Sequence, residues 1–219
     1  MERKVKHLGG IITLLISVLF ASCSPEDSIL EAIHLKNTEF LESNDDYMIL
    51  ESTVIIYNTG NAYNNLANEE IRYKAFHYAE NSDLAQMYRD KARRLRNSTK
   101  LDSDYNPNWY EEAKRADKNA LEYDSFAENN KIEFENALKD MTTESPVGGF
   151  WVYHEIEYKE YITTFYAGPY LRRYIYLFSD DGKNILWSDD LRLSNNGFRK
   201  ILDATHTQYE VAYDSRMMK

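Results

Sequence analysis

The chain contains a single cysteine, Cys23, and its thiol is the most distinctive reactive group in the sequence. Three basic residues, Arg3, Lys4 and Lys6, precede the uncharged apolar segment Leu8–Ser22, which ends at this cysteine. The segment is shorter than the ~20 apolar residues that a membrane-spanning helix needs, and a short apolar run behind a basic start is typical of secretory signals. The sequence therefore predicts a targeting segment that ends at a nucleophilic thiol.

Small and apolar residues lie immediately before the thiol, in Leu19-Phe20-Ala21-Ser22-Cys23. This pattern resembles the lipobox of bacterial lipoprotein precursors, with Phe20 at the position where that family usually has leucine. The resemblance covers residues 1–27 and implies that residues 1–22 are a lipoprotein signal peptide. It further implies that Cys23 takes a diacylglycerol on its sulfur and an acyl chain such as palmitate on its amine, and these chains would anchor the protein to a membrane.

The residues that follow the cysteine are acidic. Residues 23–27 are expected to form an acidic tether, and an acidic pair so close to Cys23 resembles the surface-export signals of Bacteroidota lipoproteins. Asp27-Ser28-Ile29 is similar to the O-glycosylation sequon of the same bacteria, but Ser28 and Glu31 also have the spacing of a capping box at a helix start, which we favour. We expect a lipid-anchored protein of the cell envelope, in the outer membrane, with the surface and the periplasmic face both left open.

The chain is acidic, with a formal net charge of −10 at pH 7. This charge argues against nucleic acid as a partner, because phosphates would be repelled, and against electrostatic attachment to anionic lipid. Acyl chains on Cys23 are therefore the expected membrane contact. Since there is no second cysteine, no disulfide is expected and a hydrophobic core must stabilise the fold.

Residue types that perform catalysis are present, but their spacing does not group them. The histidines after the leader, His34, His77, His154 and His206, are far apart, and no H-E-x-x-H motif occurs. His154 and Glu155 are adjacent in a predicted strand, so their side chains point to opposite faces and are not expected to share a metal. No G-x-S-x-G, phosphate-binding glycine loop or paired-cysteine zinc motif occurs. We therefore predict no catalytic residue, no metal and no cofactor.

Three carboxylate clusters are assigned to structural roles. Asp102-Ser103-Asp104 begins like a calcium loop, but no later glycine and glutamate complete it. Asp180-Asp181-Gly182 is explained by a turn, and Asp189-Asp190 by the end of a strand. A small hydrolase with an unrecognised carboxylate site stays open as an alternative, and it would need two carboxylates converging in a cleft.

The elements that must position these residues change character near residues 142–149. Residues 28–142 are predicted to be helical, and the apolar stripe Leu50, Val54 and Tyr57 is interpreted as a second helical segment. Helices are then expected over 71–79, over 83–96 with Ser82 as the cap, and from residue 107 to 141, where Pro107 is the first helical residue.

Residues 150–213 alternate in a way that predicts antiparallel strands, and we expect them to form one domain with the helices. Strands are expected over 150–158, 161–166, 171–178 and 184–188, and residues 195–204 could form either a hairpin or a short helix. The predicted fold class is α+β, with N-terminal helices followed by an antiparallel β-meander and helices packed on one sheet face.

The strands contain more aromatic residues than one sheet face usually needs. If Phe150, Val152 and Ile156 face the helices, alternation sends their neighbours outward. The outward rings would form a candidate binding patch ringed by charges, which is the composition of an interface. These residues are Trp151, Tyr153, Tyr174 and Tyr176.

The preferred interpretation is a non-enzymatic binding or adaptor module for an unknown protein or glycan ligand. A glycan-binding accessory lipoprotein of a nutrient-uptake system is the first alternative, because tyrosine combines a large contact area with a polar tip. The small hydrolase is the second.

Overall fold

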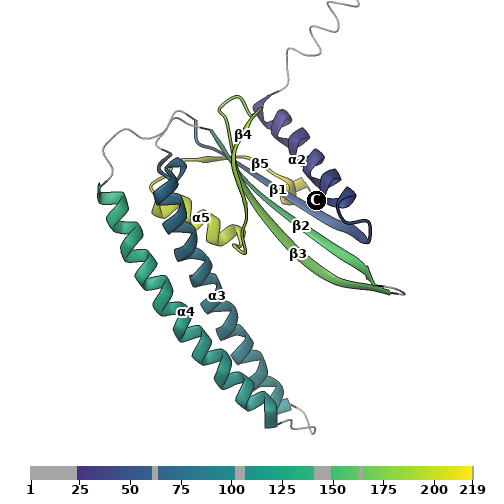
Figure 1. The fold of residues 1–219 in the computed structure, drawn as a ribbon, viewed down its shortest axis with the longest axis vertical. Coiled ribbons are helices and arrows are strands. Elements are labelled where there is room, and N and C mark those ends of the chain that lie inside the picture. The colour runs from purple at the N-terminus through teal and green to yellow at the C-terminus, as the bar shows by residue number, and fades with distance from the viewer. Residues whose placement is uncertain (1–23, 61–63, 102–106, 141–148, 163–164, 219) are drawn as a thin grey trace, which may run out of the picture.

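The computed structural model describes residues 24–60, 64–101, 107–140, 149–162 and 165–218. Four α-helices are described: α2 (Pro25–Glu42), α3 (Glu69–Leu101), α4 (Pro107–Asp140) and α5 (Asn195–Ala204). Five strands form one antiparallel sheet of order β4-β3-β2-β1-β5 (Figure 1). They are β1 (Tyr47–Asn58), β2 (Phe150–Ile162), β3 (Phe165–Phe178), β4 (Ile185–Asp190) and β5 (Glu210–Asp214). Two short 3₁₀ turns are η1 (Asn65–Ala67) and η2 (Ser215–Met218). The α+β class is confirmed.

Strand β1 corrects the prediction that residues 28–142 are helical throughout. It lies between β2 and β5, and its residues 54–57 are buried one after another. A strand that is covered on both faces has no alternation of apolar and polar residues. For this reason Leu50, Val54 and Tyr57 match the helical spacing although they belong to a strand.

Helices cover both faces of the sheet, not one. Ile29 and Ile33 of α2 pack on one face, in a cluster with Val54, Ile56, Phe150, Val152, Tyr176 and Phe178. Phe76 of α3 and Phe198 of α5 pack on the other face, in a cluster that includes Ile55, Tyr57, Trp151, Tyr153 and Ile175. Figure 1 shows α2 and α5 on opposite sides of the strands. Each central strand is therefore buried on both sides.

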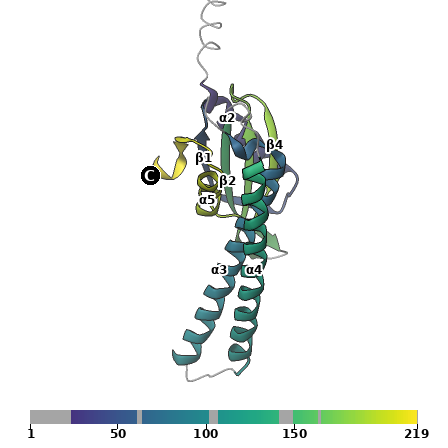
Figure 2. The ribbon, with the colours of Figure 1, turned by 90° about the vertical axis from the view of Figure 1, so that its left-hand side faces the viewer.

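Helices α3 and α4 form an antiparallel hairpin that extends beyond the sheet (Figure 2). They have 33 and 34 residues, so each is ~50 Å long. Ser82 does not begin a new helix. It lies inside α3, where its hydroxyl donates to the carbonyl of Tyr78. The seam between the two helices is built from small residues that let the backbones approach closely. The buried alanines on this seam include Ala85, Ala92, Ala113, Ala116, Ala120 and Ala127.

Helix α2 begins at Pro25, directly after its N-cap Ser24. Ser24 and Asp27 form the capping box that the sequence placed at Ser28 and Glu31, and Ser28 lies within the helix. Residues 25–27 are thus the first helical turn and not a tether. Cys23 lies outside the described residues. Among those that are described, no helix combines the length and apolar character needed to cross a membrane.

The C-terminal half contains four strands, as many as expected, but their bounds differ. The separate strand expected over 161–166 is not observed, because β2 extends to Ile162 and β3 begins at Phe165, with Tyr161 paired to Tyr166, whereas β5 was not predicted. The turn at residues 179–184 joins β3 to β4 as predicted, with Gly182 at φ +71°. Of the two alternatives for residues 195–204, the helix is observed, and Ser194 caps it by accepting from the amide of Gly197.

Candidate functional site

The four residues of the predicted aromatic patch do not share a surface. In the register of β2 and β3, Val152 pairs with Tyr176 and His154 pairs with Tyr174. Tyr174 and Tyr176 therefore lie on the α2 face, whereas Trp151 and Tyr153 lie on the face covered by α3 and α5. The prediction assumed a single buried face, and that assumption fails because both faces are covered.

Burial excludes these rings as an exposed patch. Trp151 is 0% exposed and its indole nitrogen donates to Oδ1 of Asn64 at 2.9 Å. Tyr153 is 2% exposed, and its hydroxyl donates to Oε2 of Glu155 at 2.9 Å. Tyr176 is 4% exposed and Tyr174 is half-buried. The aromatic surplus of the strands thus serves mainly to fill two cores.

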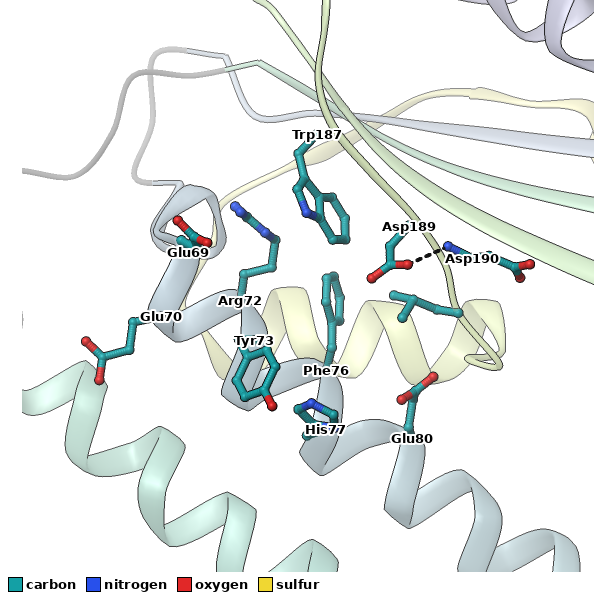
Figure 3. Close-up of a pocket in the computed structure, with 11 residues that line it drawn as sticks. Glu69, Glu70, Arg72, Tyr73, Phe76, His77, Glu80, Trp187, Asp189 and Asp190 are labelled. Carbon is teal, nitrogen blue, oxygen red and sulfur yellow. Dashed lines mark hydrogen bonds between the residues drawn. The ribbon is translucent and has the colours of Figure 1, made fainter.

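A pocket of about 670 Å³ opens between the first three turns of α3 and strand β4 (Figure 3). We call it the α3–β4 pocket. All of its lining residues come from one face of α3 or from the end of β4. Together they place carboxylates beside aromatic rings. The lining consists of Glu69, Glu70, Arg72, Tyr73, Phe76, His77, Glu80, Trp187, Asp189, Asp190 and Leu191.

Stacked planar groups form the inner wall of the pocket. The rings of Phe76 and Trp187 stack with centroids 5.5 Å apart, and the guanidinium carbon of Arg72 lies 4.7 Å from the centre of the Trp187 ring. Arg72 is 8% exposed and donates from Nη1 to the carbonyl of Ala67 at 2.8 Å. Burial lowers the pKa of Arg72, and the nearby carboxylate of Glu69 opposes that shift. A guanidinium is thus already accommodated against the aromatic wall.

The mouth of the pocket is acidic. An oxygen of Glu80 accepts from the amide of Arg192 at 3.2 Å, which joins α3 to the segment after β4. Asp189 accepts from the amide of Asp190 at 2.8 Å, as drawn in Figure 3. The Tyr73 ring is 65% exposed. These groups present carboxylate oxygens and one ring face to a ligand.

The balance of the lining favours a positively charged ligand. The lining contains five carboxylates and one guanidinium, and two of the carboxylates are already paired, Glu70 with Lys74 at 2.7 Å and Asp190 with Arg172 at 2.9 Å. The other three still outnumber the guanidinium, and a cation beside an aromatic face gains further electrostatic attraction. A sugar would need a free ring as a platform, but the Trp187 ring is in contact with Phe76, Arg72 and Trp151. The pocket therefore fits an amine or a guanidinium better than a glycan.

The sequence reasoning missed this pocket. Residues 69, 72, 73, 76, 77 and 80 have the spacing of one helix face, and this periodicity was a signal that could have grouped them. Trp187 could not be added, because nothing in the sequence shows that β4 lies beside α3.

A second pair of residues has the atoms of a nucleophile and a base. Ser52 of β1 and His154 of β2 are joined by a contact of 3.1 Å between Oγ and Nε2. Burial lowers the pKa of His154 to about 4, so it is a weak base at neutral pH. Its Nδ1 has no hydrogen-bond partner in the described part of the chain, so no carboxylate orients the ring there. The pair does not support the small hydrolase.

Exposed aromatic rings occur at the end of β2 and along the first residues of β3, which pair with each other. Tyr161 and Tyr166 face each other with ring centroids 5.1 Å apart. We call the exposed rings of Tyr161, Phe165, Tyr166 and Tyr170 the hairpin tip. Strand β3 has 14 residues and spans ~45 Å. The hairpin tip lies at its first end, and the turn at residues 179–184, which contacts the start of α2, follows its other end.

The comparisons with known proteins give no match: no family model, no curated protein and no solved structure is similar to this chain. The described residues also contain no group of three or more His, Cys, Asp or Glu arranged to hold a metal ion. Function must therefore be inferred from the geometry of the chain itself.

Proposed function

We propose that this is a lipid-anchored cell-envelope protein that acts as a non-enzymatic binding module. Its ligand carries a positively charged organic group, an amine or a guanidinium, which the α3–β4 pocket holds. The observation that carries the proposal is the excess of carboxylates around a pocket with an aromatic wall.

A half-enclosed pocket strengthens the attraction between these charges, because protein replaces part of the surrounding water. Glu80 and Asp189 belong to different elements, α3 and β4, so a cation between them would be contacted from both sides. The ring of Tyr73 adds an exposed face at the mouth.

Isothermal titration calorimetry of the full lipidated chain in detergent tests the proposal. The probes are N-acetyl-lysine amide, N-acetyl-arginine amide and the neutral N-acetyl-glutamine amide. We expect the two cationic probes to bind and the neutral probe not to bind, with affinity that falls as salt is added.

The substitutions Glu80→Gln and Asp189→Asn remove charge and keep an acceptor oxygen. Each is expected to weaken the cationic probes about fivefold, because an ion pair becomes a neutral contact. Glu122→Gln on the exposed face of α4 is the matched control and should leave affinity unchanged. Equal binding of the neutral probe, or equal affinity in all variants, would contradict the proposal.

Glycan binding is the second candidate function, and the exposed aromatic rings of the hairpin tip favour it. Sugars pack on such rings, and the tip lies far from the start of α2, which follows the proposed lipid anchor. Titration with cello- and chito-oligosaccharides tests this candidate. Tyr166→Ala should reduce such binding, whereas Tyr110→Ala on α4, where the ring is also exposed, should not.

A further inference from the structure

A cleft of about 240 Å³ lies between the C-terminal half of α2 and strands β2 and β3. It is on the sheet face opposite α3, so it is separate from the α3–β4 pocket. We call it the α2–sheet cleft. Its lining includes Lys36, Phe40, His154, Arg172, Tyr174 and Tyr176.

His154 brings an unpartnered polar atom to this cleft. Its side chain is 0% exposed, and Nδ1 has no hydrogen-bond partner among the described residues. Ser52, which contacts the opposite nitrogen Nε2, is not part of the lining, whereas His154 is. A buried polar atom without a partner destabilises a protein, which makes this atom a candidate ligand contact.

The hydrogen-bond network indicates which nitrogen carries the imidazole proton. Nδ2 of Asn37 donates to Oγ of Ser52 at 3.0 Å. A hydroxyl that accepts from Asn37 keeps its own hydrogen, which Ser52 can donate to Nε2 of His154, its other partner. This arrangement puts the proton of the neutral ring on Nδ1 and gives the cleft a hydrogen-bond donor, and it is the tautomer that carboxylate binding requires.

Two tyrosine hydroxyls add donors beside it. The rings of Tyr174 and Tyr176 lie 6.0 Å apart on β3, next to His154. Neither hydroxyl forms a hydrogen bond with another described residue. Burial raises the pKa of both tyrosines and lowers the pKa of His154 to about 4, so all three groups are uncharged at neutral pH.

The cationic side chains of the cleft are paired with carboxylates. Lys36 pairs with Glu39 at 2.7 Å, and Nε of Arg172 donates to Oδ2 of Asp190, outside the lining, at 2.9 Å. The carbonyl oxygen of Phe40 in the last turn of α2 accepts from Nδ2 of Asn44 at 2.7 Å. This oxygen therefore already has a donor and does not favour a cation in the cleft. The hydroxyls and the imidazole that remain can act as donors, and donors select a ligand with acceptor oxygens such as a carboxylate.

We propose that the α2–sheet cleft binds a small carboxylate, which accepts hydrogen bonds from Nδ1 of His154 and the hydroxyl of Tyr176. The cleft has the liquid volume of about eight water molecules, which suits acids between acetate and benzoate in size. Phe40 and Tyr174 would pack against the hydrocarbon part of such an acid. This proposal does not depend on the function assigned to the α3–β4 pocket.

Calorimetry of the full chain in detergent with sodium benzoate, against benzamide at equal ionic strength, tests the proposal. Benzoate should bind and benzamide, its neutral isostere, should not. Tyr176→Phe removes only the hydroxyl and should weaken benzoate about fivefold or more. Tyr110→Phe on α4 is the matched control and should leave the affinity unchanged. Equal affinity for benzamide, or unchanged binding in Tyr176→Phe, would overturn the proposal.

Nitrogen-15 NMR of the histidine rings gives a second readout that does not require a substitution. We expect a proton on Nδ1 of His154 in the free protein and a shift of that nitrogen when benzoate is added. A proton on Nε2 instead would remove the donor and overturn the proposal. A crystal structure from benzoate-containing solution that shows only ordered water in the cleft would also overturn it.

Discussion

The guanidinium carbon of Arg72 lies 4.7 Å from the centre of the Trp187 ring, and this contact joins α3 to strand β4 at the α3–β4 pocket. Arg72 also donates to the carbonyl of Ala67, so one side chain supports both the turn before α3 and the aromatic wall. A lysine cannot make the planar contact and the carbonyl contact together.

We therefore expect Arg72→Lys to lower the free energy of unfolding by about 1–2 kcal/mol. Chemical denaturation followed by tryptophan fluorescence measures this change. Arg115→Lys on the exposed face of α4 is the matched control and should change stability by less than about 0.5 kcal/mol. Equal effects of the two substitutions would show that the ring contact does not stabilise the fold.

Protonation of His154 should destabilise the protein as the pH falls. Its pKa is lowered from 6.5 to about 4 by burial, so the unfolded chain binds more protons between these values. The contribution of neutral His154 to the free energy of unfolding is fully present above pH 6.5. It is lost progressively toward pH 4, by about 3 kcal/mol in total.

Urea denaturation across this pH range measures that slope. The charged groups that face His154 across the cleft are Lys36, Glu39 and Arg172, and its uncharged neighbours are Ser52, Tyr174 and Tyr176. In His154→Gln these neighbours stay in place, so the difference between the two curves isolates the imidazole. A wild-type slope that survives in His154→Gln would assign it to other groups.

The seam between α3 and α4 should not tolerate larger side chains. Ala85 is 0% exposed, so a leucine there must push the two helices apart. We expect Ala85→Leu to destabilise the protein by about 1–3 kcal/mol. Lys91→Leu on the exposed face of the same helix introduces the same residue and should have little effect. Similar melting temperatures for the two variants would contradict the close packing.

The sequence predicted elements whose signals are local. Pro107 is the first residue of α4 as predicted, and the Asp-Gly turn before β4 formed as expected. The residues of β1 could not be assigned correctly, because burial on both faces removes the alternation that identifies a strand. The sequence also does not show that both sheet faces are covered. For this reason Trp151 and Tyr153 were predicted to be exposed, whereas they are buried.

The sites could be predicted less well than the fold. Trp187 and Arg72 come from a strand and a helix that are far apart in the chain, and Ser52 meets His154 only through the pairing of β1 with β2. Such contacts depend on topology, and no local pattern specifies them. The proposed lipid site at Cys23 is the opposite case, because its signal is contained in neighbouring residues.

Replacement of that cysteine tests the proposed anchor. Cys23→Ala should abolish incorporation of a clickable fatty acid in cells, because no other residue can form the thioether. Ser22→Ala keeps the thiol and a small residue before it, and should still be labelled. Label in Cys23→Ala would refute acylation at this position.

Gly182 places the β3–β4 turn against the start of α2, and a side chain there should break this contact. Its φ of +71° is unfavourable for other residues, and a methyl group would overlap the backbone carbonyl of Pro25.

Gly60 is the matched control, because it has φ +54° with no atom within 4 Å of such a methyl group. Alanine at Gly60 therefore measures the backbone strain alone, about 1 kcal/mol. We expect Gly182→Ala to lower the free energy of unfolding by about 3 kcal/mol, because α2 must also shift. Equal losses in the two variants, measured by chemical denaturation, would show that the turn and α2 do not support each other.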